Sequence, residues 1–425
     1  MESRWYRLDN AAKIYPILAN PNRSYIFRIA ANLNQEVNPE KLLEAAGDLK
    51  ARFPSIYVRL RTGVFWYYYE ENQKLPRVLP ESPYIGRAIN LQENNGYFFT
   101  LFYYKNRISL EVFHSICDGY GAMEYFKALL FRYYELLGAP VENDGYILTM
   151  DQHPSHYETE DSFLKNYMPT KRARSSAKRA YRIHGTRFRE VNGHAVINGK
   201  IPASQLLALA KKHNATLTQY LAALLTYCIY RAEAMTKLSN KPVNICVPVN
   251  MRRFFESKTL RNFSLFFHTS IDCREREWDF DSMLASVKEQ FDRELSKDRL
   301  HQTLNANVSI EKNIALRSCP IFIKWVLIKI GCMIHGDKLT TINMSNIGNV
   351  QFPASMDGLI HDFEANPSVG SDSTHNIGIV SYNDILSISF SRKIYETDIE
   401  RLFFSHIARE GVDVEIQSNL WEDYA

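Results

Sequence analysis

Residues 108–130, ISLEVFHSICDGYGAMEYFKALL, organise the prediction of the fold. Apolar residues alternate from Ile108 to Val112, which predicts a strand that ends at His114. Asp118-Gly119 then predicts a sharp turn, and the apolar spacing beyond it predicts a helix over 121–137. The sequence therefore places one imidazole at a strand end, between a sheet and a helix.

His114 is the residue of this stretch with the clearest chemical potential. Imidazole accepts and returns a proton near neutral pH, so a histidine at a strand-to-loop junction is a candidate general base. Asp118 either holds another group through its carboxylate or caps the helix that follows. Gly119 and Gly121 permit backbone angles that other residues resist. Taken alone, the six residues HSICDG favour a core histidine followed by an ordinary turn.

The composition is that of a globular protein with room for two domains. The 425 residues are 45% hydrophobic and 23% charged, and the net charge is only +4. This balance excludes a mainly disordered chain and gives no support to nucleic-acid binding. The six cysteines have no CxxC or zinc-ligand spacing, so we expect reduced thiols, no metal site and a cytoplasmic location. The N-terminus has no signal-peptide pattern.

The most apolar window is 321–334, IFIKWVLIKIGCMI. It is too short to span a bilayer, and Lys324 and Lys329 interrupt it. Three interpretations stay open: a buried or half-buried helix, the lining of a site for an apolar substrate, or contact with a membrane surface.

The first half of the chain predicts an α+β domain with a largely antiparallel sheet. Asn38 is expected to cap a helix with Pro39 at its first position. Aromatic-rich hairpins mixed with helices favour this class. The predicted strands are 24–34, 55–60, 64–70, 96–104 and 108–113, and the predicted helices are 38–51 and 121–137.

A polar connector over 139–182 separates this half from a second one that has a similar order of elements. Its basic run is either a solvated connector or an attraction for a phosphorylated cofactor; the run comprises Lys171, Arg172, Arg174, Lys178, Arg179 and Arg182. We place the domains at 1–177 and 178–425, with a cleft between them. Beyond the connector we predict strands 194–200, 243–249, 263–271, 338–344, 358–363, 376–381 and 386–391, and helices 204–213, 216–234 (capped by Asn214), 280–297, a stretch through 334, and 396–409.

Four segments together resemble the superfamily of CoA-dependent acyltransferases with the chloramphenicol acetyltransferase fold. They are HSICDG (114–119, the HxxxDG spacing), PVNMRR (248–253), NMSNIGNV (343–350) and SYNDILSISFSR (381–392). The resemblance covers nearly the whole chain, with the motifs in the order of the superfamily. The opening YRLDNAAKIYP and the segment GVFWYYYE look most like its bacterial alcohol-acetyltransferase branch.

The resemblance implies an α+β fold of two chloramphenicol acetyltransferase-like domains, with mixed, largely antiparallel sheets covered by helices and an active-site tunnel between the domains. His114 matches the active-site histidine in that tunnel. Asp118 matches an aspartate that points away from substrate and pairs with an arginine of the second domain, for which Arg252 is the match. Gly119 matches the glycine of the motif.

Residues 345–348, SNIG, match a segment that the superfamily places beside the tunnel. Ser345, Asn346 or a backbone N–H nearby is therefore a candidate donor to a developing oxyanion. A solvent-facing turn is an equally good interpretation of SNIG.

The implied activity moves an acyl group, by preference acetyl, from acyl-CoA to an alcohol or amine, with O-acylation favoured over N-acylation. His114 is the general base, no covalent acyl-enzyme forms, and Cys117 is a hydrophobic filler rather than a nucleophile. We expect a monomer with a small-molecule acceptor. Phe113 stands where condensation domains have a second histidine, and no DFGWG segment of plant enzymes is found. The alternatives are a condensation-type enzyme that takes its acyl group from a carrier protein, and a non-catalytic ligand-binding protein.

Overall fold

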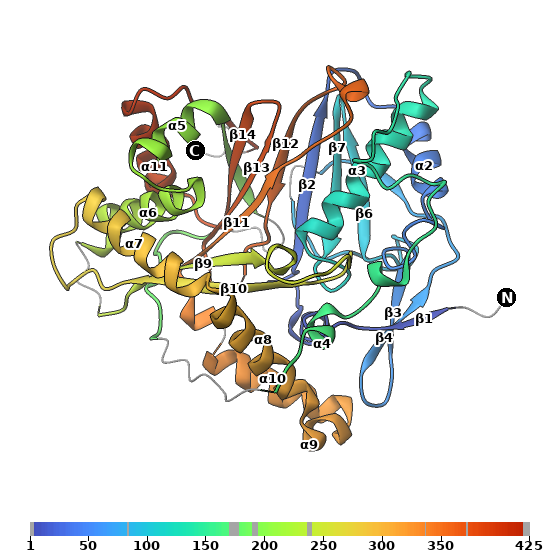
Figure 1. Cartoon of the computed structure of the whole chain (residues 1–425), viewed down its shortest axis with the longest axis horizontal. Coiled ribbons are helices and arrows are strands. Elements are labelled where there is room, and N and C mark those ends of the chain that lie inside the picture. The colour runs from blue at the N-terminus through green and yellow to red at the C-terminus, as the bar shows by residue number, and fades with distance from the viewer. Residues whose placement is uncertain are drawn as a thin grey trace.

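The computed structural model describes residues 4–82, 85–169, 178–188, 194–235, 240–335, 337–370 and 373–419. It contains two large sheets, each covered by helices, and a small third sheet near the N-terminus (Figure 1). The domain boundary predicted at 177/178 borders residues 170–177. These residues, which include Lys171, Arg172 and Arg174 of the basic run, lie outside the described residues.

The first large sheet has five strands in the order β12-β2-β7-β6-β5. Its β2, β7 and β6 are antiparallel neighbours, as the sequence predicts, and β5 adds a parallel edge. Helices α2 (Pro39–Asp48) and α3 (Gly119–Leu136) cover it. The strand bounds are β2 Ile26–Leu33, β5 Val78–Pro80, β6 Phe99–Tyr104, β7 Arg107–Phe113 and β12 Ile360–Asn366.

Both helices of this half begin where the sequence predicts a cap. The side chain of Asn38 accepts hydrogen bonds from two backbone N–H groups of the first turn of α2. The Asp118 side chain accepts from the N–H of Gly121 at the start of α3. Most of α3 is buried, because it packs between the sheet and the segments that return from the second half of the chain.

The second large sheet has seven strands in the order β10-β9-β11-β13-β14-β8-β15. It is mixed, since β11 runs parallel to both neighbours and the other pairs are antiparallel. The strands are β8 Ala195–Pro202, β9 Val243–Asn250, β10 Ser264–Ile271, β11 Ile342–Asn349, β13 His375–Tyr382, β14 Ile385–Arg392 and β15 Glu415–Ser418. Its helices are α5 Ala203–Lys212, α6 Leu217–Ile229, α7 Phe280–Glu294 and α11 Asp398–Arg409.

One strand of the first sheet comes from the far half of the chain. Strand β12 pairs with β2 and also lies against β13 of the second sheet (Figure 1). The approach is close at Gly378, where an added Cβ would lie 2.0 Å from the carbonyl oxygen of Ala365. Strand β12 therefore joins the two sheets.

The small sheet and a group of helices lie at the lower edge in Figure 1. The sheet has the order β1-β4-β3, with β1 Trp5–Arg7, β3 Val58–Thr62 and β4 Tyr67–Glu71. The helices are α8 Lys297–Lys312, α9 Ile314–Ser318 and α10 Ile321–His335, which confirms the helical stretch predicted through 334. The short α1 (Tyr15–Leu18) packs on α10, and the connector contains the short α4 (Ser162–Lys165).

Two local predictions were wrong. Asn214 does not cap α6; its φ of 52° places it in the left-handed conformation that ends α5. The cap is Thr216, which forms a reciprocal capping box with Gln219. The strand predicted over 338–344 begins only at Ile342 and continues to Asn349, so SNIG lies within β11.

Candidate active site

His114 follows the last residue of β7, as the alternation predicts. Its backbone N–H donates to the carbonyl oxygen of Tyr25, 2.9 Å away, at the start of the neighbouring strand. The ring is half-buried. The Tyr15 ring stacks on it with 4.8 Å between the ring centroids, and the Phe27 ring meets it edge-on with 5.2 Å between the centroids. The imidazole is therefore held by the backbone and by two aromatic neighbours.

Asn262 fixes the orientation of the His114 ring. Its Oδ1 lies 3.0 Å from Nδ1 of His114. Its Nδ2 lies 3.4 Å from Oδ2 of Asp9 and 3.3 Å from the carbonyl oxygen of Ser115, and both of these atoms accept hydrogen bonds. This partner set orients the amide with its oxygen toward the histidine. Nδ1 of His114 therefore carries the proton, and Nε2 has the free electron pair that a base needs.

The carboxylate behind Asn262 is buried. Asp9 is fully buried, accepts from the backbone N–H of Ala12 at 2.8 Å and lies 3.6 Å from the guanidinium of Arg261. Burial raises the pKa of Asp9, and the nearby Arg261 offsets only part of that rise. Sequence reasoning missed Asp9 and Asn262. The conspicuous opening YRLDNAAKIYP, which contains Asp9, was the one available signal.

Asp118 and Arg252 form the buried ion pair that the resemblance implies. Two nitrogens of Arg252 lie 2.8 and 3.3 Å from the two carboxylate oxygens of Asp118. The backbone N–H of Phe263 and the hydroxyl of Ser264 also donate to Asp118, each at 2.9 Å. Burial alone would raise the pKa of Asp118, but the charge of Arg252 and these hydrogen bonds outweigh it and lower the pKa.

The ion pair also fixes the segment that carries Asn262. Arg252 donates to the carbonyl oxygens of Thr259 at 2.9 Å and Arg261 at 2.6 Å. Asp118 accepts from Phe263, the residue directly after Asn262. The ion pair therefore positions Asn262, which orients the His114 ring. Among the described hydrogen bonds, none joins Asp118 or Arg252 to the ring itself.

Gly119 is the first residue of α3, and a Cβ there would lie 3.9 Å from the Ile347 side chain. This contact brings β11 beside the HxxxDG motif. The interpretation of SNIG as a solvent-facing turn was wrong: residues 345–348 are half-buried, and Ser345, Asn346 and Gly348 pair with β13. The strand is irregular at this point, with Gly348 at a φ of 96°, and a β-bulge of this kind looks like a turn in the sequence.

Asn346 already uses both ends of its amide. Oδ1 accepts from the N–H of Gly348 at 2.9 Å, and Nδ2 donates to the hydroxyl of Thr218 at 3.1 Å. As an oxyanion donor it would have to exchange its bond to Thr218 for one to substrate. The oxyanion functions of Ser345 and Asn346 stay predictions.

Cys117 lies beside the motif but lacks the environment of a nucleophile. It is buried, and burial raises the pKa of its thiol well above the usual value, with the charge of Asp118 adding to the effect. Among the residues that the structure describes, no group of three or more His, Cys, Asp and Glu side chains is arranged to hold a metal ion.

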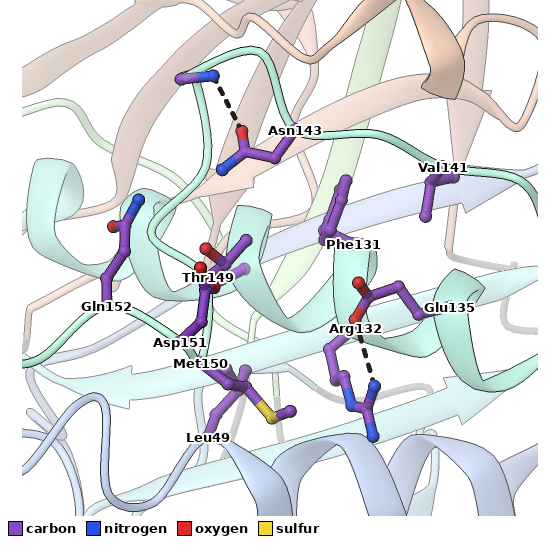
Figure 2. A pocket seen from close by; sticks show the side chains of 12 residues that line it. Leu49, Phe131, Arg132, Glu135, Val141, Asn143, Thr149, Met150, Asp151 and Gln152 are labelled. Atoms are coloured by element: carbon purple, nitrogen blue, oxygen red, sulfur yellow. Dashed lines mark hydrogen bonds and ion pairs between the residues drawn. The ribbon is translucent and has the colours of Figure 1, made fainter.

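A cavity of about 550 Å³ lies away from His114. Figure 2 shows it beside the second half of α3, where Phe131, Arg132 and Glu135 face the segment 141–152. None of the predicted site residues lines it. The predicted tunnel past His114 therefore stays a prediction.

The fold is shared with solved acyltransferases and condensation domains. TRI101 from F. sporotrichioides, solved with coenzyme A and T-2, matches with a TM-score of 0.62 and 12% identity over 98% of this chain and 100% of that one. Polyketide synthase associated protein 5 from Mycobacterium tuberculosis matches with a TM-score of 0.58 and 13% identity, over 94% of this chain and 96% of that one. The first condensation domain of the CDA synthetase matches with a TM-score of 0.55 and 13% identity, over 96% of this chain and 95% of that one.

No protein-family profile and no curated protein matches the sequence significantly. The structural matches confirm the predicted fold class. The place of the chain in the bacterial branch of the CoA-dependent acyltransferase superfamily stays a prediction. In the described part of the chain, no helix combines the length and apolar character needed to cross a bilayer.

Proposed function

We propose that the protein is an acyltransferase that moves an acyl group, by preference acetyl, from acyl-CoA to an alcohol or amine, with O-acylation favoured. The observation that carries this proposal is the contact between Nδ1 of His114 and Oδ1 of Asn262, which leaves Nε2 as the basic nitrogen. The fold adds support, because TRI101 was solved with coenzyme A. An uncharged ring with a fixed tautomer is what general-base catalysis requires.

The proposed reaction needs one base and no covalent intermediate. Nε2 of His114 takes the proton of the acceptor hydroxyl as its oxygen attacks the thioester carbonyl carbon. The tetrahedral intermediate collapses, the carbon–sulfur bond breaks, and the CoA thiolate takes the proton from Nε2. Throughout, Asn262 keeps the hydrogen bond from Nδ1–H and so stabilises the imidazolium form that exists between the two transfers.

The test measures thiol release from acetyl-CoA in the presence of a panel of alcohols and amines. We expect turnover with at least one acceptor in the wild type and in His153→Ala, a control that removes an exposed histidine. We expect His114→Ala to lose at least about two orders of magnitude in kcat. Equal turnover in wild type and His114→Ala would overturn the function of the base.

The same assay distinguishes the other candidates. Turnover with an acyl group on a carrier protein, but none with free acyl-CoA, would make the donor a carrier, as in a condensation-type enzyme. Ligand binding without turnover on either donor would favour a non-catalytic protein. The cytoplasmic location and the monomeric state also stay predictions, and sedimentation in solution tests the second.

A further inference from the structure

An exposed apolar surface, here called the α10 patch, lies far along the chain from the HxxxDG motif. It consists of the outward side chains of α10 and of the tip of the β3–β4 hairpin. Its members are Phe322 (65% exposed), Ile323 (40%), Val326 (57%), Leu327 (50%) and Ile330 (50%) on the helix, with Val64 (71%) and Phe65 (49%) on the hairpin. Contiguous apolar surface of this kind marks an interaction site.

Helix α10 is inverted relative to an ordinary surface helix. Ile321, Lys324 and Ile328 form its inward face, at the spacing of one side of a helix. Lys324 is buried, and its Nζ donates to the carbonyl oxygen of Phe65 at 2.8 Å and to that of Arg317 at 3.1 Å. The helix thus directs one charged side chain into the protein and most of its apolar side chains outward, which is the arrangement expected where the outer medium is apolar.

The hairpin tip and the helix form one continuous surface. The N–H of Ile321 donates to the carbonyl oxygen of Val64 at 3.0 Å, and the rings of Tyr67 and Trp325 stack at 6.5 Å. Figure 1 shows α8, α9 and α10 projecting together from the lower edge of the molecule, beside the β3–β4 hairpin. The projection makes the α10 patch accessible to a broad, flat partner.

The charges on the segment that contains α10 have one sign. Between residues 312 and 331 the sequence has four cations and no Asp or Glu. Three of these cations, Lys312, Arg317 and Lys329, are exposed. Apolar side chains with lysine and arginine beside them are the pattern of a helix that lies in the interface of an anionic membrane. A symmetric contact between two copies would instead bring together two surfaces of the same positive charge.

We infer that the protein binds the surface of bilayers that contain anionic phospholipids. Helix α10 and the hairpin tip lie in the headgroup region with their apolar side chains directed toward the acyl chains. The exposed cations contact the lipid phosphates and carboxylates. The protein binds on one face of the membrane through this surface. Binding requires neither acyl-CoA nor an intact His114.

The experiment is flotation of the full-length protein with vesicles, read out as the fraction of protein bound. One set of vesicles is phosphatidylcholine alone and the other contains added phosphatidylserine. We expect binding to the phosphatidylserine vesicles that weakens with added salt. The double variant Phe322→Gln and Val326→Gln should bind at least about tenfold more weakly. Leu207→Gln, which removes a 50% exposed leucine on α5, should bind like the wild type.

A charge variant separates the electrostatic contribution to membrane binding from the apolar one. Lys329→Gln should weaken binding to phosphatidylserine vesicles about fivefold and leave binding to phosphatidylcholine unchanged. Circular dichroism should show the wild-type spectrum for every variant, because the substituted side chains are exposed. Absence of wild-type binding to the phosphatidylserine vesicles, or binding of the double variant equal to that of the wild type, would overturn the inference. Self-association without lipid that the double variant abolishes would instead make the patch an interface between copies.

Discussion

The ion pair between Asp118 and Arg252 should be the most costly single contact to break. Their side chains are 3% and 7% exposed, so neither charge is screened by solvent once its partner is removed. Asp118→Asn leaves the guanidinium uncompensated, and Arg252→Gln leaves the carboxylate uncompensated. Each single variant should lose about 3 to 5 kcal/mol in the free energy of unfolding.

The double variant tests the reasoning more sharply than either single one. With both charges removed, no buried charge is left without a partner, so the loss should be close to that of one single variant rather than the sum. Urea unfolding followed by circular dichroism measures the four proteins. Losses that add to within about 0.5 kcal/mol would refute the coupling. As a control, Lys41→Gln breaks an exposed pair with Glu44 and should cost no more than about 1 kcal/mol.

The stability that Asp118 contributes should fall as the pH is lowered. The pKa of Asp118 is lower in the folded protein than its ordinary value, so the folded state favours the carboxylate. The stability that Asp118 contributes is therefore complete above the unfolded-state pKa of about 3.9, and is lost as the pH falls through the lower folded value. The difference in unfolding free energy between wild type and Asp118→Asn should be largest near neutral pH and should narrow below about pH 4. A difference that grows on acidification would contradict this assignment.

Three further outcomes are expected. Asn262→Ala removes the acceptor that faces Nδ1 of His114 and should lower kcat while KM stays close to the wild-type value; an unchanged kcat would contradict the positioning role of Asn262. Cys117→Ala should keep wild-type turnover, because burial raises the pKa of the thiol and no acyl-cysteine forms. Loss of turnover in a folded Cys117→Ala variant would instead indicate that Cys117 acts as a nucleophile. Gly121→Ala should lower the melting temperature, since its Cβ would lie 1.9 Å from the carbonyl oxygen of Leu260; wild-type stability would show that this contact relaxes.

Local rules were enough to predict the strand, the turn and the helix around His114. Alternation of apolar residues defines β7, and the Asn38 and Asp118 caps act within three residues of themselves, so a short stretch contains all the needed information. The same rules failed at Asn214 and at SNIG. A left-handed asparagine can end one helix as readily as it can precede another, and the β-bulge in SNIG places Gly348 at a turn-like φ inside a strand.

Contacts between residues far apart in the sequence could not be predicted by local rules. Arg252 lies 134 residues from Asp118, and only the resemblance to a known superfamily linked them. Asn262, which is 148 residues from His114, has no motif that marks it, and β12 leaves the second half of the chain to complete the first sheet. The sequence by itself determined which histidine stands at a strand end and how the next helix begins. Only the tertiary structure decided which amide faces that ring, because such a contact depends on how two distant segments pack and not on their local spacing.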